Sequence, residues 1–203
     1  MERFHVQETK ASLLLSMYVL GYGLGPLLFS PISEIPLIGR NWPYIISFAL
    51  FTILAVPTAL ADSWGALVAL RFITGFMSSP ALATGGASMG DLYSIIKLPY
   101  GLTAWTAAAF CAPAIGPVFS GFAVMNENWR WSLWEILWLA SPMFLAMFLF
   151  MPETSASYIL LHRAKRLRKL TGNPNLKSQS EITSAGMSFN AVLWDQLIKP
   201  IER

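Results

Sequence analysis

The sequence predicts an all-α protein embedded in a membrane. Of its 203 residues, 55% are hydrophobic and only 12% are charged, whereas a soluble domain has about 25% charged residues. The polar residues are too few to cover a water-soluble globule. The apolar residues form continuous runs, not alternating ones, which excludes a transmembrane barrel. Because lipid cannot satisfy backbone N–H and C=O groups, we expect each run to be a helix.

Five apolar runs are long enough to cross a bilayer, which takes about 20 helical residues. We expect spans near residues 11–33, 44–61, 65–89, 102–124 and 133–151. The links between them are too short to hold a soluble domain. Residues 1–151 are therefore predicted to form one membrane domain.

Basic residues predict how the spans are oriented. Arg40 and Lys97 lie in loops on the same predicted face as a basic cluster in the tail. Lys and Arg concentrate on the cytoplasmic side, so this face is expected inside and the N-terminus outside. The start does not resemble a signal peptide. An odd number of spans in this arrangement is unusual and leads us to expect that a further helix precedes the first span.

The tail, residues 152–203, is predicted to be a cytoplasmic linker with a basic amphipathic helix at residues 158–170. That helix either lies on an anionic membrane face or is a solvated linker helix, and the pattern suits both. We do not expect nucleic acid to bind it, because it follows a membrane span directly. Residues 189–203 are expected to form one more short helix.

The sequence offers no support for an enzyme, a metal site or a bound cofactor. The two histidines, His5 and His162, lie outside the spans, and Cys111 is the only cysteine. No glycine-rich loop ends in Lys-Ser or Lys-Thr, so no nucleotide site of that type is expected. The glycines of GGASMG, residues 85–90, are better explained by close packing of helices.

Arg71 is a charged residue at membrane depth, where insertion costs about 3 kcal/mol. It either faces a polar cavity, where it could influence a proton site, or extends to the outer interface. Its position, six residues beyond Gly65, favours the cavity. Glu135 lies only two residues inside the fifth span and is interpreted as an interfacial carboxylate.

Glu34 and Arg40 flank a short turn that Pro36 and Gly39 are expected to bend. These charges either simply flank two spans or lock against neighbouring helix ends. Asp91 closes the third span on the same predicted face, so we expect it to pair with Arg40.

The fourth span contains APAIGPVFSG, residues 112–121. Pro117 interrupts the hydrogen bonds of the helix, while Gly116 and Gly121 allow another backbone to approach closely. This pattern is either an ordinary membrane-helix kink or a specific packing motif. Trp105 and Thr106, earlier in the span, are candidates to face a substrate cavity.

Together these stretches resemble the major facilitator superfamily. Residues 25–44 (GPLLFSPISEIPLIGRNWPY) resemble the motif A loop of that family, and LVALRFITGF, around Arg71, resembles motif B. APAIGPVFSG resembles motif C, the antiporter motif, with Ala112 and Ser120 replacing glycines. The spacing from Glu34 to Gly39-Arg40 is most similar to the fungal twelve-span drug:proton antiporters that confer azole and benomyl resistance.

The resemblance implies a partial N-terminal helical bundle of that family, with the five spans matching family spans two to six. It implies that Arg71 tunes proton coupling and that Glu34, Gly39, Arg40 and Asp91 form a cytoplasmic gate. It also implies a helix kink, and the residues concerned are Gly116, Pro117 and Gly121.

The expected partners are the lipid bilayer, protons and hydrophobic small molecules, with other transporter chains as a further candidate. The expected location is the plasma membrane, with the vacuolar membrane as an alternative. The competing hypothesis is a truncated, non-transporting membrane fragment or an interaction partner of full-length transporters.

Overall fold

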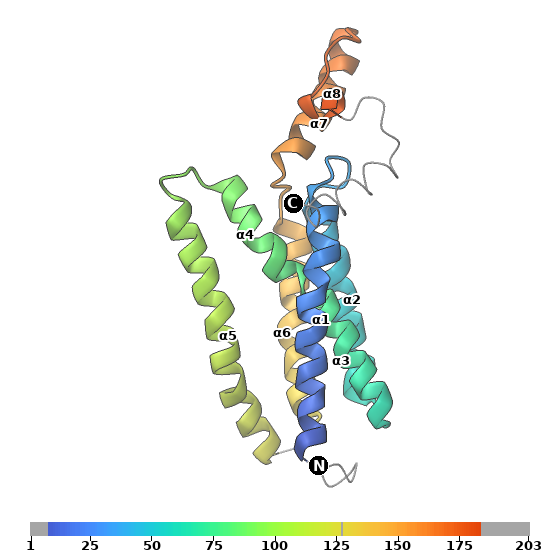
Figure 1. The fold of residues 1–203 in the computed structure, drawn as a ribbon, viewed down its shortest axis with the longest axis vertical. Coiled ribbons are helices and arrows are strands. Elements are labelled where there is room, and N and C mark those ends of the chain that lie inside the picture. Colours follow the sequence, from blue (N-terminus) through green and yellow to red (C-terminus); the bar gives the residue numbers. More distant parts are fainter. Residues whose placement is uncertain (1–7, 127, 184–203) are drawn as a thin grey trace.

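The computed structural model describes residues 8–126 and 128–183, and these contain helices but no strands. The predicted helix at residues 189–203 lies outside the described residues. The elements are α1 (Glu8–Glu34), α2 (Asn41–Leu60), α3 (Trp64–Ser78), α4 (Pro80–Leu92), α5 (Leu98–Asn126), α6 (Trp131–Phe150), α7 (Ala156–Thr171) and α8 (Gln179–Thr183). Figure 1 shows α1, α2, α5 and α6 running along one axis, with α3 and α4 following one another as a further span and α7 and α8 at one end.

Five segments of the described chain are long and apolar enough to cross a membrane. They correspond to the five expected spans, so the all-helical membrane fold is confirmed. One span differs from the expectation of a single helix at residues 65–89, because α3 ends at Ser78 and α4 starts at Pro80.

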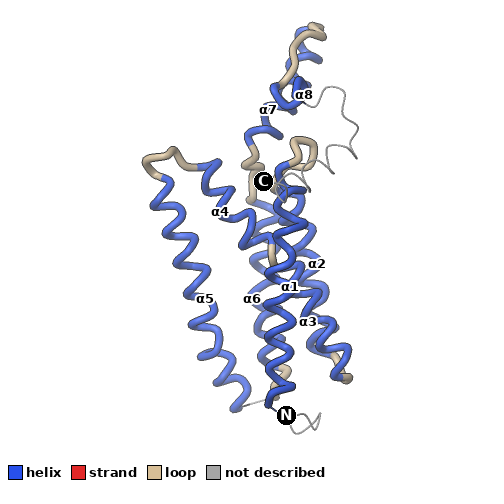
Figure 2. The backbone as a smooth tube through the Cα atoms, in the orientation of Figure 1, coloured by secondary structure: helices blue, strands red, loops and turns tan. Residues whose placement is uncertain are grey.

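The break in the third span has a local cause. Pro80 has no N–H to donate, and its ring disfavours a continuous helix through the preceding turn. Ser79 occupies the break, where its backbone N–H and its hydroxyl both donate to the carbonyl oxygen of Phe76, at 3.4 and 2.7 Å. Beyond this point α4 leads towards α5 (Figure 2).

The most extensive helix contact joins α1 and α3. Gly21 and Gly25 lie one turn apart on α1, and Gly75 lies opposite them on α3. A Cβ atom on Gly21 would collide with the carbonyl oxygen of Phe72, and one on Gly75 with that of Tyr18. Small residues let membrane helices approach this closely, because apolar surface alone gives helices little reason to associate in lipid.

Helix α5 is much less covered than the other spans. Its main contacts are with α4 and α6, and every residue from 107 to 119 is exposed. One of its contacts with α6 is a hydrogen bond of 2.6 Å between the hydroxyls of Ser120 and Ser132. Figure 1 shows α5 standing apart from the other spans.

The loops with Arg40 and Lys97 and the basic tail helix lie at one end of the bundle, as expected, and Asp62 and Arg130 lie at the other (Figure 1). At the opposite end, Arg130 before α6 pairs with Asp62 before α3, with 2.7 Å between Nη2 and Oδ1.

The tail helix predicted at residues 158–170 is observed as α7. Gly172 ends it in a left-handed conformation, with φ of 66°. Helix α8 begins with a reciprocal cap between Ser178 and Glu181, and Arg168 forms an ion pair with Glu181. The pKa of Glu181 is lowered by the Ser178 N–H and by Arg168. Helix α7 rises along the bundle axis beyond the end of α6 (Figure 1).

We expect Gly21→Leu or Gly75→Leu to prevent normal folding, because the added side chain would collide with backbone atoms that cannot move aside. Overpacking of this kind typically costs about 1–3 kcal/mol or more. Size-exclusion chromatography of the protein in detergent should show loss of the monodisperse peak. Gly23→Leu is the matched control, since the space around Gly23 is open, and it should retain the peak. Equal behaviour of the two sites would show that the close α1–α3 contact is not important.

Candidate functional site

The turn between α1 and α2 is tightly folded around Gly39. The N–H groups of Ile38 and Gly39 both donate to the carbonyl oxygen of Ile35, each at 3.0 Å. Gly39 has φ of 74°, in the left-handed region that side chains disfavour. A Cβ atom there would also lie 2.5 Å from Oε2 of Glu153. Both conformation and space therefore require glycine.

The Glu153 carboxylate holds this turn against the start of the tail. It accepts hydrogen bonds from the backbone N–H groups of Arg40 (3.0 Å), Asn41 (3.1 Å), Thr154 (3.0 Å) and Ser155 (2.9 Å). Helix α2 starts at Asn41 and α7 follows Ser155, so one carboxylate lies at the N-termini of two helices. Both helix dipoles stabilise a negative charge there. We call this arrangement the Glu153 clamp.

A side-chain contact reinforces the Glu153 clamp. Asn41 donates from Nδ2 to the carbonyl oxygen of Met151 at 3.1 Å. The sequence analysis assigned no role to Glu153. The available signal was an acidic residue two positions before Ser155, and serine is a residue type that favours the start of a helix.

Arg40 and Asp91 form the expected ion pair. Nε of Arg40 lies 2.7 Å from Oδ2 of Asp91, and the two side chains are 13% and 25% exposed. Nη1 of Arg40 is buried and has no hydrogen-bond partner in the part of the chain that the structure describes. The ion pair joins the α1–α2 turn to the end of α4.

Glu34 takes no part in this arrangement. It is exposed at the end of α1, and none of the ion pairs found within residues 8–126 and 128–183 includes it. Of the four predicted gate residues, the structure therefore brings together Gly39, Arg40 and Asp91. Glu153, which the sequence analysis did not predict, supplies the carboxylate that contacts the turn.

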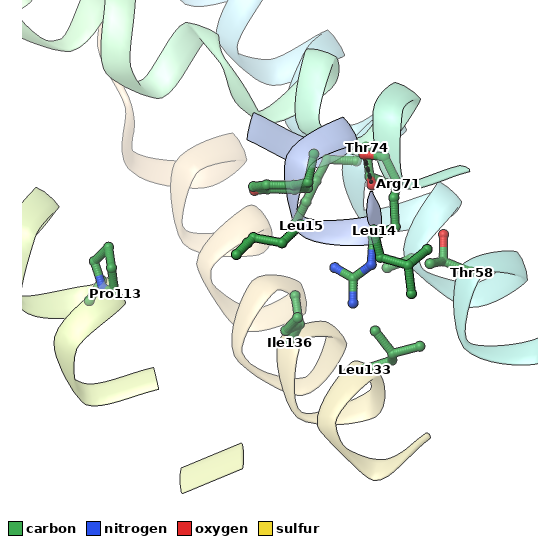
Figure 3. A pocket seen from close by; sticks show the side chains of 12 residues that line it. Leu14, Leu15, Thr58, Arg71, Thr74, Pro113, Leu133 and Ile136 are labelled. Carbon is green, nitrogen blue, oxygen red and sulfur yellow. Dashed lines mark hydrogen bonds between the residues drawn. The ribbon is translucent and has the colours of Figure 1, made fainter. Parts of the chain in front are cut away.

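A second feature is a cavity of about 630 Å³ at membrane depth. Five helices line it: α1, α2, α3, α5 and α6. Its lining is mostly apolar, and the polar groups include Tyr18, Thr58, Arg71 and Thr74. Figure 3 shows Pro113 of α5 on the opposite side of the cavity from the other labelled residues.

Arg71 is the one positively charged residue in the cavity lining. Its guanidinium group extends from α3 towards Leu133 and Ile136 of α6 (Figure 3). No carboxylate among the described residues pairs with it. The neighbouring Thr74 hydroxyl already donates to the carbonyl oxygens of Leu70 and Arg71, at 2.8 and 3.1 Å. Arg71 thus presents N–H donors to a largely apolar cavity.

The residues singled out on α5 lie elsewhere. Trp105 packs against Gly85 of α4. A Cβ atom on Gly85 would collide with the indole nitrogen of Trp105. Neither Trp105 nor Thr106 lines the cavity, to which α5 contributes Ala112 and Pro113. The helix continues unbroken through Pro117.

The glycines expected to pack closely on α5 have no neighbours in the structure. No described atom lies within 4 Å of where a Cβ atom would be on Gly116 or Gly121. Their close-packing role is thus not fulfilled by any helix that the structure describes.

Comparison with known proteins gives consistent matches. The family model described as Major Facilitator Superfamily matches residues 1–197. The chain is 47% identical to the MFS-type transporter pyvG of Aspergillus violaceofuscus, 42% to the transporter mfs1 of Schizosaccharomyces pombe and 44% to the multidrug transporter FLR2 of Candida glabrata. These alignments cover 97%, 98% and 98% of this chain.

The chain spans only about a third of the length of these relatives, with 36%, 38% and 34% of them covered. No solved structure matches it.

We expect Glu153→Ala to destabilise the end of the bundle that carries the tail, because four N–H groups would lose their acceptor. Hydrogen bonds to charged groups contribute about 1.5–3 kcal/mol each, so the thermal midpoint in detergent should fall clearly. Glu153→Gln, which keeps one carbonyl acceptor, should fall less. Glu34→Gln is the control, since Glu34 is exposed, and it should leave the midpoint unchanged. Equal midpoints for Glu153→Ala and Glu34→Gln would rule out a structural role for the clamp.

For the ion pair, we expect Arg40→Asp to lower the thermal midpoint by placing two negative charges together. Asp91→Arg should lower it by placing two positive charges together. The double exchange should recover most of the loss, about 1 kcal/mol for a partly exposed pair. Additive effects in the double variant would show that the contact contributes nothing to stability.

Proposed function

The chain belongs to the Major Facilitator Superfamily, and we propose that it acts within a transporter that expels hydrophobic small molecules in exchange for protons. The family and the membrane-spanning helices make it a multi-pass membrane protein. The similarity to relatives such as the multidrug transporter FLR2 supports the proposal that the substrates are drug-like compounds. We further propose the plasma membrane as its location, because efflux there removes a compound from the cell.

The observation that carries the proposal is Arg71 in the membrane cavity. The apolar walls suit a hydrophobic substrate, and few polar groups are needed to orient it. A charge at this depth is costly unless it serves a polar partner or a water-filled path. A cavity with apolar walls and a positive charge supports a role in transport more than a purely structural role for the bundle.

Proton coupling would use the same guanidinium group. A positive charge within about 4–6 Å of a carboxyl group favours loss of its proton. The cavity lining contains no carboxylate among the described residues. In our proposal Arg71 therefore acts on an acidic group from a part of the intact transporter outside these residues.

We propose that the cytoplasmic end is a gate built from Gly39, Arg40, Asp91 and Glu153. The clamp fixes the α1–α2 turn to the tail, and the ion pair fixes it to α4. Opening this end would break the ion pair between partly exposed groups while leaving the backbone turn intact. Glu34 is the gate candidate with the least support, because it is exposed.

We propose that Gly116, Pro117 and Gly121 form a contact surface for another part of the transporter. Their exposed helix face offers a smooth surface on which another helix of the transporter could slide. The competing hypothesis, a non-transporting fragment or partner protein, finds no support among the three relatives described above, each of which is named as a transporter.

The proposal is tested by azole accumulation in yeast that lacks its own efflux pumps. Cells that produce the protein should accumulate less azole than empty cells, and a protonophore should abolish the difference. Arg71→Ala should reduce efflux by roughly tenfold or more, a typical size for coupling between sites, and Arg71→Lys should retain part of it. Arg163→Ala, outside the membrane, is the control. Unchanged accumulation, with the protein shown to be in the membrane, would contradict transport by this chain.

A further inference from the structure

Helix α7 ends at a threonine that follows two basic residues. Thr171 is the last residue of the helix, and Arg168 and Lys169 lie three and two positions before it. Basophilic Ser/Thr kinases have acidic substrate grooves, and they recognise a hydroxyl by positive charges at these two positions. The sequence around Thr171 therefore has the charge pattern of a substrate for this class of kinase.

Thr171 is also accessible to another protein. Every residue from 169 to 177 is exposed. The Thr171 hydroxyl donates to the carbonyl oxygen of Leu167 at 2.8 Å, within the last turn of the helix. The helix stops at Gly172, which has φ of 66°, and helix ends fray more readily than helix interiors. A kinase can therefore bind this segment in an extended form without unfolding the rest of α7.

The other hydroxyls in the described part of the tail lack this combination of features. Ser155 and Ser178 are 6% and 7% exposed, and both cap helices. Ser180 has a single basic residue, Lys177, three positions before it, and its hydroxyl is hydrogen-bonded to that of Ser178 at 3.0 Å. The remaining hydroxyls, which have no basic residue at either position, are Thr154, Ser157 and Thr183. Charge pattern and exposure thus coincide at Thr171.

A phosphate on Thr171 would compete for the ion pair that joins α7 to α8. Arg168 pairs with Glu181 of α8, and the two side chains are 28% and 21% exposed. Residues three apart lie on the same face of a helix, so the phosphate is within reach of the Arg168 guanidinium. A phosphate carries about 1.5 to 2 negative charges, against one on a carboxylate, and it binds a guanidinium in a bidentate manner. Arg168 would therefore exchange Glu181 for the phosphate, which also repels Glu181.

We propose that Thr171 is a phosphorylation site for a basophilic Ser/Thr kinase and that its phosphate releases α8 from α7. The kinase transfers the γ-phosphoryl group of ATP to Oγ1 of Thr171. The bond from that phosphorus to the β-phosphate oxygen breaks, ADP leaves, and the hydroxyl proton passes to the catalytic base of the kinase. The site requires the tail to lie in the cytoplasm, where the sequence predicts it and where ATP is present. It is independent of whether the protein transports drugs.

Incubation of the purified chain in detergent with ATP and the catalytic subunit of cAMP-dependent protein kinase, a basophilic kinase, tests the site. Mass spectrometry of the peptides should place the phosphate at Thr171, and Thr171→Val should abolish it. Arg168→Gln should slow the reaction by roughly tenfold or more, because it removes a charge that the kinase binds. Arg163→Gln is the matched control, since Arg163 is an exposed arginine of the same helix outside the recognised positions. Phosphate at another residue, or equal rates for the two arginine variants, would overturn the proposal.

Hydrogen exchange at the backbone amides of residues 178–183 tests the release of α8. After phosphorylation these amides should exchange about fivefold faster, the size expected for loss of a partly exposed ion pair. Glu181→Gln removes the ion pair without adding a phosphate, so it should exchange as fast before phosphorylation and no faster afterwards. The amides at the start of α7 should be unaffected in every case. Unchanged exchange in α8 of the fully phosphorylated wild-type chain would overturn the release.

Discussion

The Glu153 carboxylate, at the N-termini of α2 and α7, determines how the end of the bundle that carries the tail is built. Helix N-termini leave backbone N–H groups without partners, and one anion satisfies four of them here. This arrangement brings residues more than 100 positions apart into contact. It also explains why Gly39 has no room for a side chain. The turn, the end of α6 and the start of the tail therefore behave as one structural unit.

Arg40 contacts two different partners. Its backbone is held by Glu153, so its side chain is available to pair with another residue. Its N–H donates to Glu153, whereas its guanidinium group reaches Asp91 on α4. The two contacts have different strengths. Each hydrogen bond to the Glu153 carboxylate contributes more stability than a partly exposed ion pair, and Glu153 accepts several of them. A rearrangement at this end would thus release α4 before it released the tail, so within the gate that we propose the Arg40–Asp91 pair is the part suited to open.

The sequence predicted the features that depend on composition and local order. These include the five spans, the Arg40–Asp91 pair and the tail helix. It did not predict the role of Glu153, because the local signal near Ser155 concerns the start of α7 and nothing in it indicates the contact with the distant start of α2. Trp105 was assigned to a cavity from residue type alone, whereas its position against Gly85 depends on how α4 and α5 cross. The break at Ser79 was overlooked, although Pro80 was a visible signal.

Exposure has a different meaning in lipid from its meaning in water. The uncovered face of α5 costs little there, since lipid tails are as apolar as its side chains, and helix packing depends instead on small residues such as Gly21 and Gly75. The costly groups are polar ones without partners. Arg71 is such a costly group, because its N–H donors face a mostly apolar cavity. In the transporter that we propose, water, a substrate or an acidic side chain reaches that cavity, so the cavity must be accessible in at least one of its conformations.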